Sequence, residues 1–333
     1  MGNDYFTFAE VYAAFEWLQT QHPQHVQLLA LPELTHEGRS VRALRLCENT
    51  SSSVRKPVFM VIGGLHGCEW GSSEIIINLA TTLLQGRASG LDFGGGVTHT
   101  KEVAQSILQG LDLLLVPLAN PDGGFTSRTN FDSWRKNRSR EQASNGPGIG
   151  VDLNRNFDHP LTGSTEPVTS SQYAGLAPFS EPESRNIRAL VQTWDPDWFV
   201  DLHSAARCVV FPWSVEQPAA PMPAADVLAH EALGGAYAGA AQQVSGQLIR
   251  VSAGFQFTSA SGTSHDWVYA RARPPHPAPG GGSGAPRGQT LAFCIEWSRD
   301  TVPMWFDMQA QMRESGAGLV AMCLRVLSGQ PRP

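Results

Sequence analysis

The chain has 333 residues, of which 41% are hydrophobic and 16% are charged, so it is long and apolar enough to bury a large core. Its formal net charge of -6 argues against a nucleic-acid-binding protein, because such proteins usually carry a strongly basic face. Five widely spaced cysteines do not suggest a disulfide framework, no apolar run approaches the ~20 residues of a membrane span, and no signal peptide is visible, so we expect a cytoplasmic protein.

The N-terminal part of the chain is expected to alternate between helices and strands. A capping-box pattern at Thr7–Glu10 begins the first helix, and Glu37–Arg39 has the residues of a hairpin turn. Two continuous apolar runs predict buried strands, and the motif Asn120-Pro121-Asp122-Gly123 after the second run predicts a turn. The sequence thus predicts helices over 8–21 and 72–85, and strands over 26–30, 41–47, 57–63 and 111–117.

The C-terminal part begins with a segment, 121–179, that lacks hydrophobic periodicity, and so long a loop-rich stretch inside a domain is usually functional. Ser180, Pro182 and Glu183 carry the signals of a helix start. Residues 273–288 contain five prolines and five glycines, which predicts a surface insertion that cannot contribute to a core. We expect further helices over 224–243 and 304–327, and buried strands over 198–202 and 291–295. The alternation of strands and helices predicts an α/β sheet with parallel portions.

Three of these strands end on or near side chains that bind metals or move protons. His66 and Glu69 follow the strand at 57–63, His203 ends the strand at 198–202, and Glu296 ends the strand at 291–295. Strand ends in open α/β sheets are where ligands bind. A lone histidine is a weak signal, but His-x-x-Glu with a distant strand-end histidine makes a three-ligand zinc site, whose open fourth position is typical of catalytic zinc.

The chain resembles the zinc carboxypeptidases of the carboxypeptidase A/B type from about Tyr5 to its C-terminal helix. The resemblance rests on several motifs in the family's order, which makes it specific. These motifs are His66-Gly67-Cys68-Glu69-Trp70, Asn120-Pro121-Asp122-Gly123, Trp134-Arg135-Lys136-Asn137-Arg138, Asp152-Leu153-Asn154-Arg155-Asn156, Phe179-Ser180-Glu181-Pro182-Glu183, Asp201-Leu202-His203-Ser204 and Ser261-Gly262-Thr263-Ser264. The resemblance implies one domain over residues 1–333, a three-layer α/β/α sandwich with a mixed, mostly parallel twisted sheet.

The resemblance also implies roles for the strand-end residues. His66, Glu69 and His203 would bind one Zn²⁺ per chain, which polarises the scissile carbonyl and lowers the pKa of a water molecule. Glu296 would be the general base that takes the proton of that water. Arg135 would stabilise the developing oxyanion, with a solvated position in a basic run as the alternative.

Other matched positions imply contacts around the zinc and the substrate. Asp152 resembles the carboxylate that orients the first zinc histidine. Asn154 and Arg155 would clasp the terminal carboxylate of the substrate, and an ordinary salt bridge is the alternative for Arg155. Thr258 stands where the family carries a substrate-binding tyrosine. His265 occupies the base of the specificity pocket, where a neutral imidazole donates a hydrogen bond and a protonated one offers a positive charge.

The predicted function is therefore hydrolysis of the C-terminal peptide or amide bond of a substrate with a free carboxylate. The expected partner is a peptide or an amino-acid amide, without nucleic acid or membrane, and the oligomeric state stays open. Two alternatives remain: a zinc deacylase of N-acyl amino acids, and a metal-free binding module on the same fold. The natural substrate is not identified by the sequence.

Overall fold

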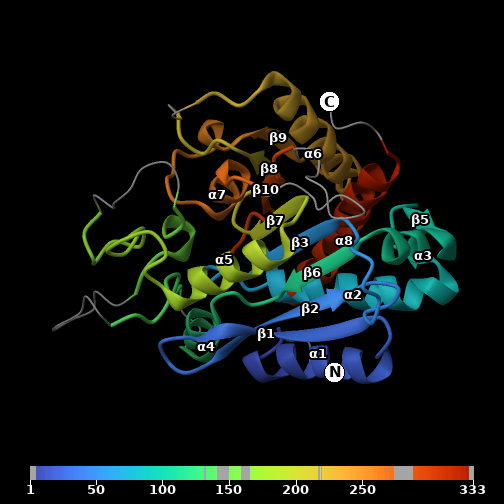
Figure 1. The fold of residues 1–333 in the computed structure, drawn as a ribbon, viewed down its shortest axis with the longest axis horizontal. Coiled ribbons are helices and arrows are strands. Elements are labelled where there is room, and N and C mark those ends of the chain that lie inside the picture. The colour runs from blue at the N-terminus through green and yellow to red at the C-terminus, as the bar shows by residue number, and fades with distance from the viewer. Residues whose placement is uncertain are drawn as a thin grey trace.

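An eight-stranded sheet runs through the part of the chain that the structure describes, in the order β1-β2-β6-β3-β7-β10-β8-β9 (Figure 1). The structure is a computed structural model, and it describes residues 5–130, 133–140, 150–158, 166–216, 218, 220–273 and 288–329. Of the predicted insertion at 273–288, residues 274–287 lie outside the described residues.

The central strands of the sheet are parallel, and antiparallel strands extend it on both sides. β6, β3, β7 and β10 form the parallel centre, and β8 returns antiparallel to β10. The strands of the sheet are β1 (Val26–Leu34), β2 (Ser40–Leu46), β3 (Val58–Gly63), β6 (Asp112–Val116), β7 (Trp198–His203), β8 (Cys208–Phe211), β9 (Arg250–Ala253) and β10 (Leu291–Glu296). Two short strands, β4 (Leu91–Asp92) and β5 (Thr98–His99), pair separately. The central strands read as continuous apolar runs because both of their faces are covered.

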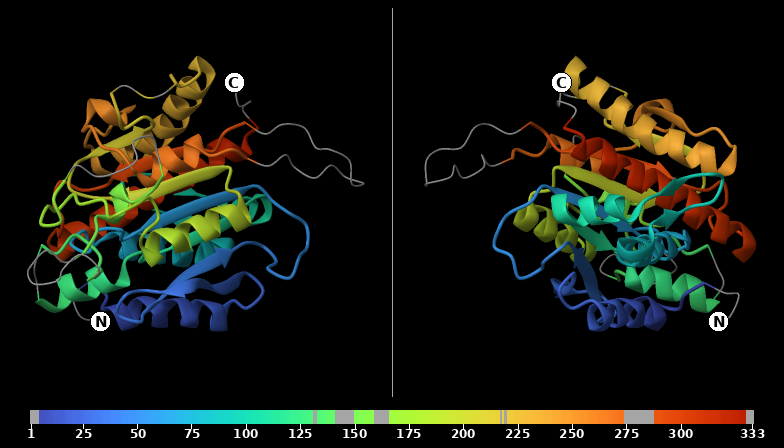
Figure 2. Two further views of the ribbon diagram at one scale, coloured as in Figure 1. Left: turned by 60° about the vertical axis from the view of Figure 1, so that its left-hand side comes forward. Right: turned by 90° about the vertical axis from the view of Figure 1, so that its right-hand side faces the viewer.

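Helices cover both faces of the sheet. In β3, Phe59 and Val61 belong to one buried cluster, whereas Met60 and Ile62 belong to another, so the two clusters lie on opposite faces. The first cluster includes residues of α1 (Phe8–Gln21), α2 (Ser72–Ser89), α3 (Lys101–Gly110), α6 (Ala224–Ser245) and α8 (Trp305–Leu327). The second includes residues of α5 (Pro182–Trp194) and α7 (Ser264–Ala270). The predicted three-layer arrangement is confirmed, and the two views of Figure 2 show α2 and α8 on one side of the sheet and α5 on the other.

Several local predictions need correction. Asn120 to Gly123 does not form an isolated turn, because Pro121 begins a helix, α4 (Pro121–Asn130). Asn120 acts as its cap: its Oδ1 accepts the Gly123 N–H at 2.8 Å, and proline at the first helical position needs no hydrogen bond. The helix expected at Ser180 starts with Glu181 as its N-cap. Strands β8 and β9 and helices α3 and α7 were not predicted from the sequence. Among the described helices, none combines the length and the apolar character that a membrane span requires.

Candidate active site

The strand order brings the predicted ligand positions together at one end of the sheet. β3, β7 and β10 are neighbours and run parallel, so their carboxyl ends meet at the same edge. His66 and Glu69 lie in the loop after β3, and His203 ends β7. Glu296 ends β10 directly opposite His203 in the strand register. Residues from three distant parts of the chain are thereby within reach of one ligand.

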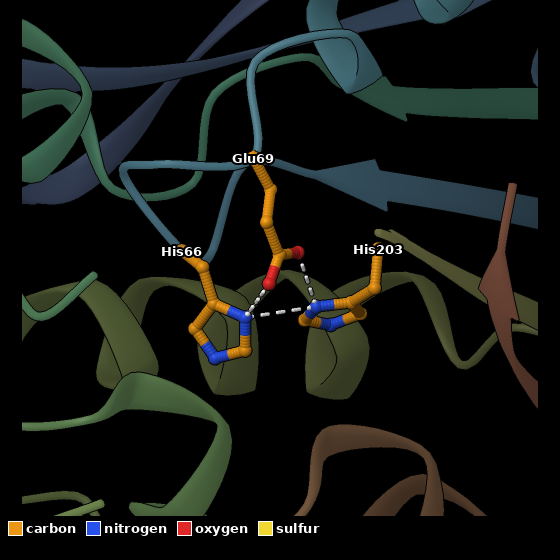
Figure 3. Close-up of side chains that lie close together, drawn as sticks. All are labelled: His66, Glu69 and His203. Carbon is orange, nitrogen blue, oxygen red and sulfur yellow. Dashed lines mark hydrogen bonds and ion pairs between the residues drawn. The ribbon is translucent and has the colours of Figure 1, made fainter. Parts of the chain in front are cut away.

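His66, Glu69 and His203 point toward one another (Figure 3). The Nδ1 atom of His66 lies 2.7 Å from Oε1 of Glu69, and the Nδ1 atom of His203 lies 2.9 Å from Oε2 of the same carboxylate. The two Nδ1 atoms are 3.0 Å apart. All three side chains are buried.

A further carboxylate stands behind each histidine. The Nε2 atom of His66 lies 3.0 Å from Oδ1 of Asp152, and the Nε2 atom of His203 lies 3.0 Å from Oδ2 of Asp201. A carboxylate at each Nε2 favours the tautomer with the proton on that nitrogen, which leaves the Nδ1 atoms of both rings toward the Glu69 carboxylate. Two imidazole nitrogens that converge on one carboxylate, with a second carboxylate at the far side of each ring, are a donor set that fits a zinc ion.

Asp201 is a site residue that the sequence prediction missed. Asp201 and His203 are two positions apart in β7, and alternate residues of a strand point to the same face. That spacing was the available signal. Asp152, by contrast, was predicted in this position. Burial acts to raise the pKa of Asp152, but Arg135 and His66 outweigh it and hold that pKa well below its usual range, so the carboxylate stays ionised.

Glu296 lies in the same cavity wall as the three candidate ligand residues and has an unsatisfied carboxyl oxygen. Its Oε2 atom is buried and has no hydrogen-bond partner among the described residues. Burial, and then the nearby carboxylate of Glu69, raise the pKa of Glu296 to about 7. A bound dication would lower that pKa again. A carboxyl group with such a pKa can accept and release a proton near neutral pH.

Arg135 and Arg155 both take part in contacts at the site. Arg135 donates from Nε to Asp152 at 3.0 Å and lies 3.4 Å from Glu69, so it does not stand in a solvated basic run. Arg155 donates to the backbone oxygen of Asn154 at 2.8 Å and to Gln172 at 3.1 Å. Neither contact of Arg155 is a salt bridge, which leaves its charge available for an anionic ligand.

One cavity of about 280 Å³ joins the predicted residues. Its wall contains His66, Glu69, Arg135, Asn154, Arg155, His203, Thr258, His265 and Glu296, whereas Asp152 lies behind His66. The wall also contains Ser204, Ser214, Phe257 and Cys294.

His265 is a buried part of the cavity wall, and its surroundings decide its charge. Its Nε2 atom lies 2.8 Å from Oγ of Ser214, and its Nδ1 atom is buried without a partner among the described residues. Burial lowers the pKa of His265 to about 3. Of the two charge states considered from the sequence, the neutral imidazole is therefore the one present near neutral pH.

Comparisons with known proteins point to one family. Residues 11–317 match a protein family that is described as "Zinc carboxypeptidase". An inactive metallocarboxypeptidase ecm14 from Talaromyces stipitatus is 33% identical over 212 residues, which cover 60% of this chain and 34% of the relative. Carboxypeptidase A1 from Rattus norvegicus is 28% identical over 273 residues, which cover 80% of this chain and 60% of the relative. The chain thus spans only part of the length of these curated relatives.

Solved structures show the same fold. Bovine thrombin-activatable fibrinolysis inhibitor, in complex with tick carboxypeptidase inhibitor, superposes with a TM-score of 0.78 at 19% identity, covering 98% of this chain and 99% of that one. Carboxypeptidase A from Helicoverpa armigera superposes with a TM-score of 0.78 at 22% identity, covering 99% of this chain and 75% of that one. The predicted carboxypeptidase A-like fold is confirmed.

Proposed function

The chain belongs to the zinc carboxypeptidase family, and we propose that it is an active metallocarboxypeptidase that removes the C-terminal residue of a peptide with a free carboxylate. The observation that carries this proposal is one cavity whose wall holds the His66, Glu69 and His203 cluster together with Glu296 and Arg155. That combination supplies a metal site, a proton acceptor and a carboxylate receptor within one substrate-sized space.

The side chains divide the chemistry of the proposed reaction among them. His66, Glu69 and His203 would hold zinc, which supplies Lewis-acid catalysis when bound by polarising a carbonyl and lowering the pKa of a water. Glu296 removes a proton from the attacking water and delivers it to the leaving amine. Arg135, oriented by Asp152, donates to the oxygen on which negative charge develops.

Arg155 and Asn154 would make the enzyme an exopeptidase by binding the terminal carboxylate. The Arg155→Ala protein is expected to lose activity on a free-acid peptide by roughly tenfold or more, because a charge-assisted hydrogen bond contributes about 1.5–3 kcal/mol. The C-terminal amide of the same peptide should be cleaved slowly by wild type and should be little affected by the substitution. Measuring kcat/KM for both peptides tests the proposed function directly.

A matched control for this measurement is Arg188→Ala. Arg188 lies over the ring of Phe179 and is not part of the cavity wall, so its removal takes away an arginine without touching the site. Equal losses on the acid and the amide in Arg155→Ala would mean that Arg155 is structural. Equal cleavage of both peptides by wild type would argue for an amidase or deacylase instead.

The polar base of the cavity is proposed to select the side chain that is released. His265 and Ser214 offer hydrogen bonds, and no carboxylate other than Glu69 and Glu296 belongs to the described cavity wall. Lysine or arginine would be buried there without a free anionic partner. We expect polar or acidic C-terminal residues to be released better than lysine or arginine, by a factor on the order of ten.

Peptides that differ only in the last residue test this specificity at pH 6 and pH 8. The pKa of His265 lies at about 3, so its neutral form dominates above that value and the ranking should be the same at both pH values. His265→Ala should reduce the differences between side chains. A clear preference for lysine or arginine would refute the proposal, and an unchanged ranking in His265→Ala would show that another residue sets it.

A further inference from the structure

A second group of metal-ligating side chains lies outside the catalytic cavity. His36, Glu181 and Glu183 each offer a ligand atom, and these atoms lie within 4.8 Å of one another. His36 comes from the loop between β1 and β2, whereas the two glutamates begin α5. Glu181 and Glu183 are buried, whereas His36 is exposed and forms part of the wall of a separate cavity of about 480 Å³ with Glu37, Arg138 and Arg140.

The imidazole and one carboxylate of this group are already in contact. The Nε2 atom of His36 lies 2.8 Å from Oε2 of Glu181. The equivalent contact at the catalytic centre, between His66 and Glu69, measures 2.7 Å. Both places therefore hold an imidazole nitrogen and a carboxylate oxygen at a separation that a bound transition-metal ion would widen only slightly.

Asn137 fixes the two carboxylates as a pair. Its Oδ1 accepts the backbone N–H groups of Val151 at 2.8 Å and Ser139 at 3.2 Å, which settles the orientation of the amide. Its Nδ2 therefore faces the glutamates and donates to Glu181 at 2.7 Å and to Glu183 at 3.0 Å. On Glu181 the amide binds Oε2, the oxygen that also contacts His36, and ligating carboxylates commonly accept such additional hydrogen bonds.

One oxygen of this pair is left without a donor. The side chain of Glu183 is fully buried, and its Oε1 atom has no hydrogen-bond partner among the described residues. Asn137 binds the other oxygen of this carboxyl group, and the ligand atom that Glu183 offers lies within 4.8 Å of those of His36 and Glu181. The helix N-terminus favours acidic residues in general, but it does not account for a buried oxygen without a partner.

We propose that His36, Glu181 and Glu183 form a second binding site for a divalent transition-metal ion. A nitrogen donor combined with carboxylates suits zinc or manganese better than calcium or magnesium, which prefer oxygen ligands throughout. The ion would join the β1–β2 loop to α5. Through Asn137, it would also brace the segment that carries Arg135.

Calorimetric titration of metal-stripped protein with Zn²⁺ tests the second site without any measurement of activity. Wild type is expected to bind two equivalents and the His66→Ala protein one. In the His66→Ala background, Glu183→Gln should abolish the remaining binding, since the substitution is nearly isosteric but removes the charge. His36→Ala in the same background should do the same.

Glu37→Gln in the His66→Ala background is the matched control. Glu37 forms part of the wall of the same separate cavity but is not among the proposed ligands, so one equivalent should remain. The proposal is overturned if folded His66→Ala protein binds no zinc, or if Glu183→Gln and Glu37→Gln bind it equally well. Either result leaves the proposed peptidase function untouched, because the catalytic ligands are separate.

Discussion

The Glu296→Gln protein is expected to keep its zinc and to lose peptidase activity by ~10²–10⁴-fold, the usual contribution of a general base. Glutamine has nearly the same shape as glutamate but cannot accept the proton of the attacking water. Glu296 is not one of the three clustered metal ligands, so metal binding should survive the change. The measurement is kcat/KM on a free-acid peptide, made on protein whose zinc content has been determined.

Glu102→Gln provides the comparison for Glu296, because Glu102 is an exposed residue of α3 remote from the cavity wall. It should have wild-type activity. If fully metallated Glu296→Gln protein turns over at nearly the normal rate, another group is the base. One of the relatives is named an inactive metallocarboxypeptidase. If the wild-type protein also shows no peptidase activity in this assay, the chain would instead be a binding module on the same fold.

Replacement of His66 by alanine is expected to remove about one equivalent of zinc per chain, relative to wild type, together with all measurable peptidase activity. His66 supplies one of three donors. Without it only Glu69 and His203 remain, and two protein ligands are too few to hold a catalytic zinc ion tightly. It also leaves Asp152 buried without the imidazole that it orients. Elemental analysis of the purified proteins measures the loss.

His99→Ala controls for the removal of an imidazole as such, because His99 lies in β5 and contributes nothing to the cavity wall. It should retain the zinc content and activity of wild type. Equal zinc in His66→Ala and wild type would contradict the assignment of the metal site. In that case the deacylase and peptidase hypotheses would both lose their common basis.

Some local features escaped sequence reasoning because their signals were short or ambiguous. β8 and β9 contain four residues each, too few to display periodicity. The residues Asn120 to Gly123 suit both a turn and a helix start, and the hydrogen bond from Gly123 to Asn120 decides for the helix. Long apolar runs such as Val58–Gly63 were predictable because both faces of a central parallel strand are buried.

The sequence by itself determined the central strands, the longer helices α1, α2, α5, α6 and α8, and the candidate ligands His66, Glu69 and His203, since these depend on local apolar runs and on motifs of known order. Only the tertiary structure decided which groups meet across long separations. The contact of His265 with Ser214 and the grouping of His36 with Glu181 and Glu183 are of this kind, and burial in the folded chain keeps His265 neutral. Such pairings depend on side-chain direction, burial and strand order, and spacing along the chain specifies none of these across distant segments.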